Sequence, residues 1–305
     1  MKRLAMLLLL CVAPVMAQQA SETSLGAAGV SSSTSLLGYS YVPTYKDIYC
    51  AGFISREHFD DRNHIVGGRL SPEVVHFGLN ETVFLAGSHY RVGEKYAIIR
   101  DLHDPNRYEL YTGQDKDVSQ LGHQYAELGH VRILSLENGY AIAKIEASCE
   151  PMVPGDVAIP FRDKAEIVVQ PRTTPFPVFG VPLPKHFGRI VMSNEFDYML
   201  GTLKPVYINL GSKAGLKPGD YLRVTRTYNP ATMPEGDRIT LDAPVREDTQ
   251  RYPLATPKST MKNWPPKGVG ELMVLSVTPN TATCLVTMAL EDLKLGDIVT
   301  PESER

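Results

Sequence analysis

The sequence predicts an all-β protein made of two tandem small β-barrel units, which are related by an internal repeat and joined by a Pro-rich linker. Three observations predict this class: a composition rich in turn residues, a turn-then-strand pattern used four times, and a second half that repeats the first. The chain has 305 residues, and its 24 glycines and 23 prolines favour many turns and short strands over long helices. A prior of roughly 150 residues per domain also predicts two domains.

The turn-then-strand pattern is clearest between residues 211 and 226. Gly211 and Gly215 suit tight turns, because glycine adopts positive φ without a Cβ clash. Pro218-Gly219 fits the two central positions of a type II turn. Apolar and polar residues then alternate from Tyr221 onward, which is typical of a half-buried strand.

The same turn recurs at residues 91–94, 153–156 and 294–297, each time before a short apolar run. The residues expected to define these turns are Gly93, Gly155, Pro218, Gly219, Asp220, Gly296 and Asp297. The clearest hairpin joins strands 130–136 and 140–147 through Asn138-Gly139, the strongest short-range signal of a type I′ turn. Further strands are predicted over residues 82–85, 96–100, 206–210, 221–226, 271–277 and 281–289.

The second half of the chain repeats the first. Residues 129–160 align with residues 270–301 without a gap, and eight of the 32 positions are identical. The upstream halves match with small gaps, as in Arg100 and Arg226. Because the matched positions are turn and alternating strand residues, the repeat indicates a shared fold and not a duplicated catalytic site.

The N-terminus has the pattern of an export signal over residues 1–17. Lys2 and Arg3 precede a short apolar run, and small residues precede Gln18. We then expect a flexible segment over 18–45, a first β unit over 46–162, the linker over 163–187 and a second β unit over 188–302. The protein is therefore expected to be exported, periplasmic or secreted, with no membrane span after signal cleavage; an uncleaved anchor is the alternative.

Two insertions interrupt the predicted units. Residues 101–122 are polar and rich in turn signals, and Thr227–Gly268 contains seven prolines. Since so long a loop is usually functional or disordered, residues 227–268 are the expected partner contact. Residues 54–64 fit either one helical turn or a polar loop.

Export would place Cys50, Cys149 and Cys284 in an oxidising compartment, where one disulfide and one free thiol are expected. A Cys50–Cys149 disulfide would tie the approach to the first unit to the end of its hairpin. Cys284 aligns with Ala143 inside a strand, so we expect a buried thiol.

The second unit resembles the small β module that accompanies LysM peptidoglycan-binding domains in exported bacterial proteins, and the C-terminal domain of flagellar assembly protein T. The resemblance rests on the order of Gly188-Arg189-Ile190, residues 206–211, residues 215–220, residues 269–272 and Leu295-Gly296-Asp297. It implies a non-catalytic SH3-like barrel. No LysM segment is found, so glycan binding does not carry over from the resemblance.

The sequence has no hydrolase, dinucleotide-binding or phosphate-loop motif, and we expect no catalytic residue, no cofactor and no metal. His58, Asp60 and His64 could in principle ligate a metal, but a solvated loop is the simpler interpretation. His123, His130 and His186 stand singly and are expected on the surface or in turns. The four tyrosines Tyr39, Tyr41, Tyr45 and Tyr49 indicate either a partner-binding strip or edge-strand packing.

These features predict a non-catalytic envelope protein that acts as a binding or scaffold module. A protein partner in the envelope is expected, peptidoglycan is a possible ligand, and the net charge of −3 gives no indication of nucleic-acid binding. One alternative is a structural component of an envelope machine, such as a flagellar basal body or a secretion apparatus. A more distant alternative is an enzyme of unknown type.

Overall fold

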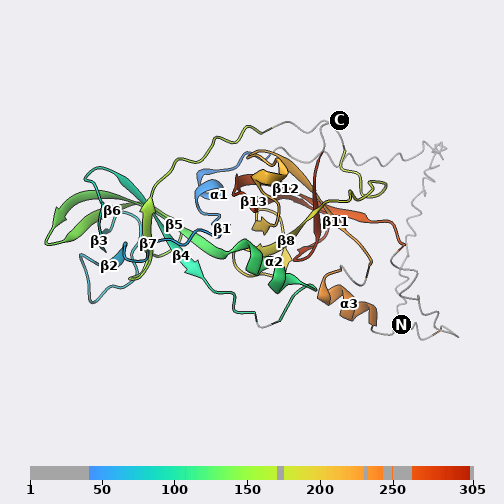
Figure 1. Cartoon of the computed structure of the whole chain (residues 1–305), viewed down its shortest axis with the longest axis horizontal. Helices are drawn as coiled ribbons and strands as arrows, with labels where there is room; N and C mark the ends of the chain where they lie inside the picture. The colour runs from blue at the N-terminus through green and yellow to red at the C-terminus, as the bar shows by residue number, and fades with distance from the viewer. Residues whose placement is uncertain are drawn as a thin grey trace, which may run out of the picture. The chain divides into compact units, whose positions relative to one another are not determined.

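Six antiparallel strands close into a barrel in each half of the chain (Figure 1). The computed structural model describes residues 41–106, 108–169, 175–229, 233–242, 249 and 263–302, all of which belong to one compact unit. The signal predicted over residues 1–17 lies outside the described residues. The predicted flexible segment does so up to residue 40.

The first barrel closes in the order β5-β4-β7-β2-β3-β6, with β6 pairing again with β5. Its strands are β2 His64–Gly68, β3 Thr82–Ala86, β4 Lys95–Leu102, β5 His123–Glu137, β6 Tyr140–Ser148 and β7 Val157–Pro160. A short additional strand, β1 Phe53–Ser55, pairs with the start of β5 outside the closed ring.

The second barrel closes in the order β10-β13-β12-β11-β15-β8. Its strands are β8 Gly188–Ser193, β10 Pro205–Ile208, β11 Tyr221–Arg226, β12 Lys267–Val277, β13 Ala282–Ala289 and β15 Ile298–Pro301. A separate two-stranded ribbon joins β9 Met199–Leu200 to β14 Leu293–Lys294.

The two barrels have the same connectivity when their strands are taken in chain order, which confirms the internal repeat. The register also repeats, because Val83 faces Ala143 in the first barrel as Val206 faces Cys284 in the second. The bulge between Ile133 and Ser135 of β5 has its counterpart between Val274 and Ser276 of β12. Bulges bend a strand at a fixed point, so the two barrels share their curvature as well as their strand order.

The predicted turns have the geometry that their residues favour. Gly93, Gly155, Gly219 and Gly296 all have φ between 85° and 97°. Asn138 and Gly139 both have positive φ, which fits the predicted type I′ hairpin. Gly211 differs from the expectation, because its φ is −139°. Glycine is needed there because a Cβ would lie 2.4 Å from the carbonyl oxygen of Thr278.

An arginine–aspartate pair fastens the last turn of each barrel. In the first barrel Arg100 Nε lies 2.8 Å from Asp156 Oδ1, and in the second Arg226 Nε lies 2.9 Å from Asp297 Oδ1. Each aspartate also accepts a hydrogen bond from a backbone N–H three residues earlier in its own turn. The repeated Arg and Asp therefore hold the turn that precedes the closing strand.

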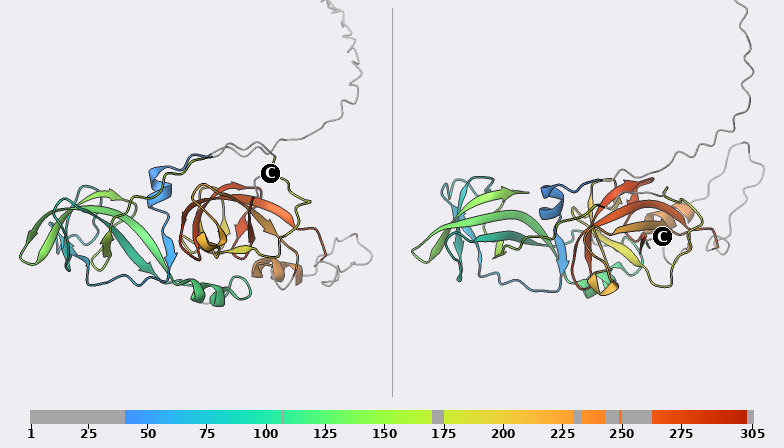
Figure 2. Two further views of the ribbon diagram at one scale, coloured as in Figure 1. Left: turned by 45° about the horizontal axis from the view of Figure 1, so that its top comes forward. Right: turned by 90° about the horizontal axis from the view of Figure 1, so that it is seen from above.

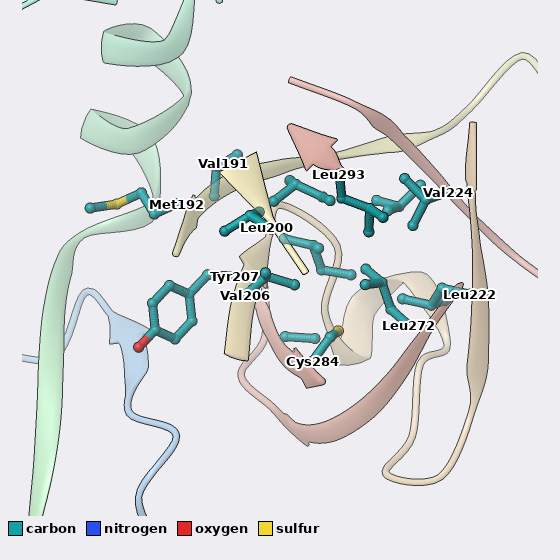
Figure 3. Close-up of a cluster of buried hydrophobic side chains, with 14 of the residues drawn as sticks. Val191, Met192, Leu200, Val206, Tyr207, Leu222, Val224, Leu272, Cys284 and Leu293 are labelled. Atoms are coloured by element: carbon teal, nitrogen blue, oxygen red, sulfur yellow. The ribbon is translucent and has the colours of Figure 1, made fainter. Parts of the chain in front are cut away.

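Figure 2 shows the two barrels in two further views. Each barrel encloses a cluster of buried apolar side chains. Figure 3 shows Val206, Leu222, Leu272 and Cys284 pointing into the second barrel. Cys284 is a free, fully buried thiol, as expected from its alignment with Ala143. Burial raises the pKa of this thiol, so it stays protonated inside the barrel.

Within the described residues, four short helices lie outside the barrels: α1 Tyr45–Tyr49, α2 Gln114–Leu121, the 3-10 helix η1 Ser212–Ala214, and α3 Glu235–Asp242. The first insertion therefore contains a helix, and the start of residues 227–268 forms α3. Between 54 and 64 the chain ends β1 and then runs as a loop to β2. Among the helices of the described part of the chain, none is long and apolar enough to cross a membrane.

Candidate interaction surface

The predicted disulfide joins α1 to the end of β6. Cys50 directly follows α1 and is bonded to Cys149, with a Cα–Cα separation of 5.6 Å. Thr44 and Asp47 form a capping box that begins the helix, because each accepts a hydrogen bond from the other's backbone N–H. The helix α1 therefore begins at Tyr45, next to the boundary that the sequence predicts between the flexible segment and the first β unit.

Of the four tyrosines considered as a partner-binding strip, Tyr39 lies outside the described residues. The hydroxyl of Tyr41 donates a hydrogen bond to the carboxylate of Asp47. The prediction of edge-strand packing is wrong for the other two, because both lie on α1. Tyr45 places its hydroxyl 3.1 Å from His130 Nδ1, and Tyr49 stacks on Phe161. These contacts seat α1 on the first barrel.

A buried ion pair fixes the beginning of the linker. Lys164 Nζ lies 2.6 Å from Glu127 Oε2 and also donates to the carbonyl oxygen of Ile48. Burial raises the pKa of Glu127, while the lysine opposes that shift. Further along the linker, Phe176 is buried and its ring stacks on the guanidinium of Arg223 on β11. The Cζ atom of Arg223 lies 4.4 Å from the centroid of the ring. The described part of the linker contains no helix or strand, and Phe176 holds it against the second barrel.

The backbone just after Cys50 runs along the outer wall of the second barrel. Three of its carbonyl oxygens accept hydrogen bonds from side chains of the second barrel. Tyr207 on β10 donates to Ala51 at 2.8 Å, Thr283 on β13 donates to Gly52 at 2.9 Å, and Thr281, just before β13, donates to Ile54 at 3.0 Å. Figure 3 shows the Tyr207 ring projecting from the barrel. Burial removes these backbone carbonyl groups from water. The hydrogen bonds from the second barrel replace the ones that water would have made.

Apolar side chains of the first half complete this contact. Ile54 on β1, Tyr111 in the first insertion and Leu121 on α2 all belong to the core cluster of the second barrel. Gln124 at the start of β5 donates to the carbonyl oxygens of Ser193 and Asn194. The insertion at residues 101–122, expected only to be a polar loop, is thus part of the junction between the barrels.

The second insertion is anchored at both of its described ends. The N–H of Glu235 on α3 donates to the carbonyl oxygen of Leu110, and Asp237 pairs with Lys294. At the other end Trp264 packs edge-on against Tyr228, with ring centroids 5.1 Å apart. Trp264 is the single tryptophan of the sequence and is 41% exposed. An aromatic surface thus lies at the base of the predicted partner contact, whose middle lies outside the described residues.

The residues considered as metal ligands have other partners. Asp60 pairs with Arg62 at 2.7 Å, and His64 Nδ1 lies 2.8 Å from the carbonyl oxygen of Asp61. His58 is exposed. Across the residues that the structure describes, no three His, Cys, Asp or Glu side chains are grouped so that they could hold a metal ion.

Of the single histidines, His123 and His186 are exposed, as expected. His130 is not on the surface: it is buried against Tyr45 and Phe161, and its Nε2 lies 3.5 Å from Glu146 Oε2. The expected surface position is wrong because Tyr45 of α1 and Phe161 cover His130 on β5.

Comparison with protein-family models and with curated protein sequences gives no match for this chain. The interaction residues that the sequence did not reveal are Tyr207, Thr281 and Thr283. The only sequence signal for them was their outward position in the strand alternation of the repeat.

Proposed function

We propose that this chain is a non-catalytic binding or scaffold protein of the cell envelope. The aromatic pair at the base of the second insertion, in which Trp264 is exposed and Tyr228 is half-buried, is the observation that carries the proposal. Aromatic side chains supply large contact areas at little cost in conformational entropy and are enriched among residues that dominate binding energies. The partner of this surface is an envelope protein; peptidoglycan is a second ligand to be tested.

Three cations at buried or half-buried positions support a scaffold role. Arg100, Arg226 and Lys164 each form an ion pair with a carboxylate, and these pairs hold turns or the linker in place. A charge engaged in this way stabilises the fold and is not poised for proton transfer. The Cys50–Cys149 disulfide supports export, because disulfides persist in oxidising compartments.

Affinity capture from a native envelope extract, with mass spectrometry of the bound proteins, tests the proposal. The mature chain is compared with a variant in which residues 243–262 are replaced by a short Gly-Ser linker, which keeps α3 and β12. Trp264→Ala tests the aromatic pair, and Tyr108→Ala, also an exposed aromatic, is its matched control. We expect both insertion variants to lose the captured protein and Tyr108→Ala to keep it.

Unchanged capture by both insertion variants would contradict the proposed site. Capture of nothing by the intact chain would contradict the function itself. Sedimentation of the purified protein with isolated peptidoglycan measures the second ligand directly.

A structural component of an envelope machine is the second candidate. The repeated barrel favours it, because one barrel already docks on the wall of the next within this chain. Cofractionation with purified basal bodies or secretion complexes distinguishes this role from that of a free binding protein.

A further inference from the structure

The outer wall of the second barrel is covered by a segment that leads into the first barrel. Five outward positions of this wall are each at most 3% exposed: Val191, Tyr207, Leu275, Thr281 and Thr283. Residues 51–54 supply most of the cover, through the three carbonyl groups described above and through Ala51, which packs on Leu275. We call residues 51–54 the entry segment of the first half.

The second half has an entry segment of its own, residues 178–181. In the first half, β1 pairs antiparallel with the start of β5, and this register, continued by two residues, places Ala51 opposite Glu127. Gly268 on β12 holds the position of Glu127 on β5 in the repeat. The N–H of Gly268 donates to the carbonyl oxygen of Val178 at 2.7 Å, so Val178 is the counterpart of Ala51.

An aromatic ring precedes each entry segment by two residues and packs on its own barrel. Tyr49 stacks on Phe161, which directly follows β7 of the first barrel. Phe176 stacks on Arg223 of the second barrel. The two entry segments therefore start from equivalent anchors, which supports their assignment as counterparts.

The two entry segments differ in what covers them. Ala51 and Ile54 are each 1% exposed, because they lie against the second barrel. Phe179, in the second entry segment, is 59% exposed. Residues 178–184 read Val-Phe-Gly-Val-Pro-Leu-Pro and contain no charged or hydrogen-bonding side chain. The second half thus presents an exposed apolar segment where the first half binds the next barrel.

The first barrel presents an equivalent wall, and that wall is open. The matched pairings and bulges of the two barrels identify its residues as Val66, Phe84, Leu134, Tyr140 and Ile142, the counterparts of Val191, Tyr207, Leu275, Thr281 and Thr283 in that order. Val66 is 39% exposed, Leu134 is 49% exposed and Tyr140 is 47% exposed. A group of exposed apolar side chains of this kind marks an interaction surface.

The chemistry of the open wall matches the second entry segment. Phe84 and Ile142 replace two of the hydroxyl side chains that bond carbonyl groups on the second barrel. The open wall therefore favours apolar side chains over backbone carbonyl groups. Residues 178–184 supply such side chains, and the ring of Phe179 is the largest of them.

We propose that the open wall of the first barrel binds residues 178–184 of a second copy of this chain. The contact repeats between molecules the one by which residues 51–54 join the two barrels within a molecule. It is heterologous, because the wall and the segment are different surfaces, so it generates a ring if the rotation closes and a filament if it does not. The inference goes beyond the proposed function, because it concerns contact between copies of the chain and not capture of an envelope partner.

Two charge substitutions separate the two sides of the contact. Leu134→Glu disables the wall and Phe179→Glu disables the segment. Both side chains are exposed, so both variants are expected to fold. Tyr108→Glu and Met199→Glu, at exposed positions outside both surfaces, are the controls. Light scattering coupled to size-exclusion chromatography gives the mass of the mature protein at concentrations up to ~100 µM.

We expect the unmodified protein and both controls to form species larger than a dimer, and Leu134→Glu and Phe179→Glu to be monomeric. An equimolar mixture of these two variants retains one intact wall and one intact segment, so it should form a 1:1 dimer and nothing larger. A monomeric unmodified protein, or a mixture that stays monomeric, would overturn the proposal. So would normal assembly of either variant; normal assembly of Phe179→Glu alone would assign the wall to another part of the second copy.

Discussion

Gly52 lies at the junction of the two barrels, where its carbonyl oxygen accepts a hydrogen bond from Thr283. Its φ is +70°, and a Cβ there would lie 2.6 Å from both the carbonyl oxygen of Tyr125 and the hydroxyl of Tyr207. Gly180 has a similar φ of +83° but has no atom within 4 Å of the Cβ position. Substituting Gly180 therefore measures the free-energy cost of the backbone conformation alone. Substituting Gly52 adds the cost of steric crowding.

We expect Gly180→Ala to lower the free energy of unfolding by about 1–2 kcal/mol, the usual cost of a left-handed backbone for an L-residue. Gly52→Ala should cost clearly more, because Tyr207 must also move and lose its bond to Ala51. Urea denaturation of both variants measures the difference. Equal losses would show that the barrels are not held at Gly52.

His130 makes the stability of the first barrel depend on pH. Burial and the nearby Lys95 lower its pKa, while Glu146 acts in the opposite direction. The fold therefore favours the neutral imidazole. Its contribution to stability is complete above the ordinary histidine pKa of about 6.5 and is lost as the pH falls through the lower value of the folded state.

The free energy of unfolding should fall between about pH 7 and about pH 5, and the fall should be shallower in His130→Gln, which keeps a polar contact with Tyr45. Chemical denaturation at a series of pH values provides the measurement. His123→Gln, at an exposed histidine, is the control and should follow the unmodified protein. Parallel curves for all three proteins would rule out His130 as the titrating group.

At the scale of elements, the disulfide is the strongest single constraint on α1. It closes a loop between positions 99 residues apart, for which the chain-entropy model gives about 4–5 kcal/mol. Replacing both Cys50 and Cys149 by Ala should lower the free energy of unfolding by up to that amount. Cys284→Ala, which installs the residue of the first barrel at the equivalent position, should cost about 1 kcal/mol.

Thermal unfolding with and without a reductant checks the assignment. The reductant should lower the melting temperature of the unmodified protein and of Cys284→Ala, and leave the Cys50→Ala/Cys149→Ala variant unchanged. A reductant effect that disappears in Cys284→Ala would mean that the buried thiol takes part in the bond.

The turns and hairpins could be predicted because their signals are local. Asn138-Gly139 and Pro218-Gly219 determine their own backbone geometry, and the strands on either side follow from alternation. The helices in the insertions could not be predicted so easily. The N-cap of α2 is Gly113, which has no side chain to cap the helix, and Leu121 is buried by the other half of the chain. α1 did have a local signal, the Thr44–Asp47 capping box, which the tyrosine-rich composition obscured.

At the scale of the whole molecule, duplication could be predicted but docking could not. Identical turn residues at a constant offset indicate two copies of one fold whatever their arrangement. Docking depends on outward side chains such as Tyr207 and Thr283, whose partners are carbonyl groups about 150 to 230 residues away. Carbonyl groups are present at every residue, so the sequence gives no sign of which ones will be bound.

The shared cluster around Ile54 predicts how the whole molecule unfolds. Ile54 belongs to the first half but is 1% exposed within the core cluster of the second barrel, so the two barrels are expected to unfold in one transition.

Ile54→Ala leaves a cavity at this junction and should lower the free energy of unfolding by about 2–5 kcal/mol. It should also separate the barrels into two transitions, because the contact that couples them is weakened while each remaining core is intact. Val66→Ala, at an exposed position of β2, is the control and should stay within about 0.5 kcal/mol of the unmodified protein. Scanning calorimetry resolves the transitions; two transitions already present in the unmodified protein would mean that the junction does not couple the barrels.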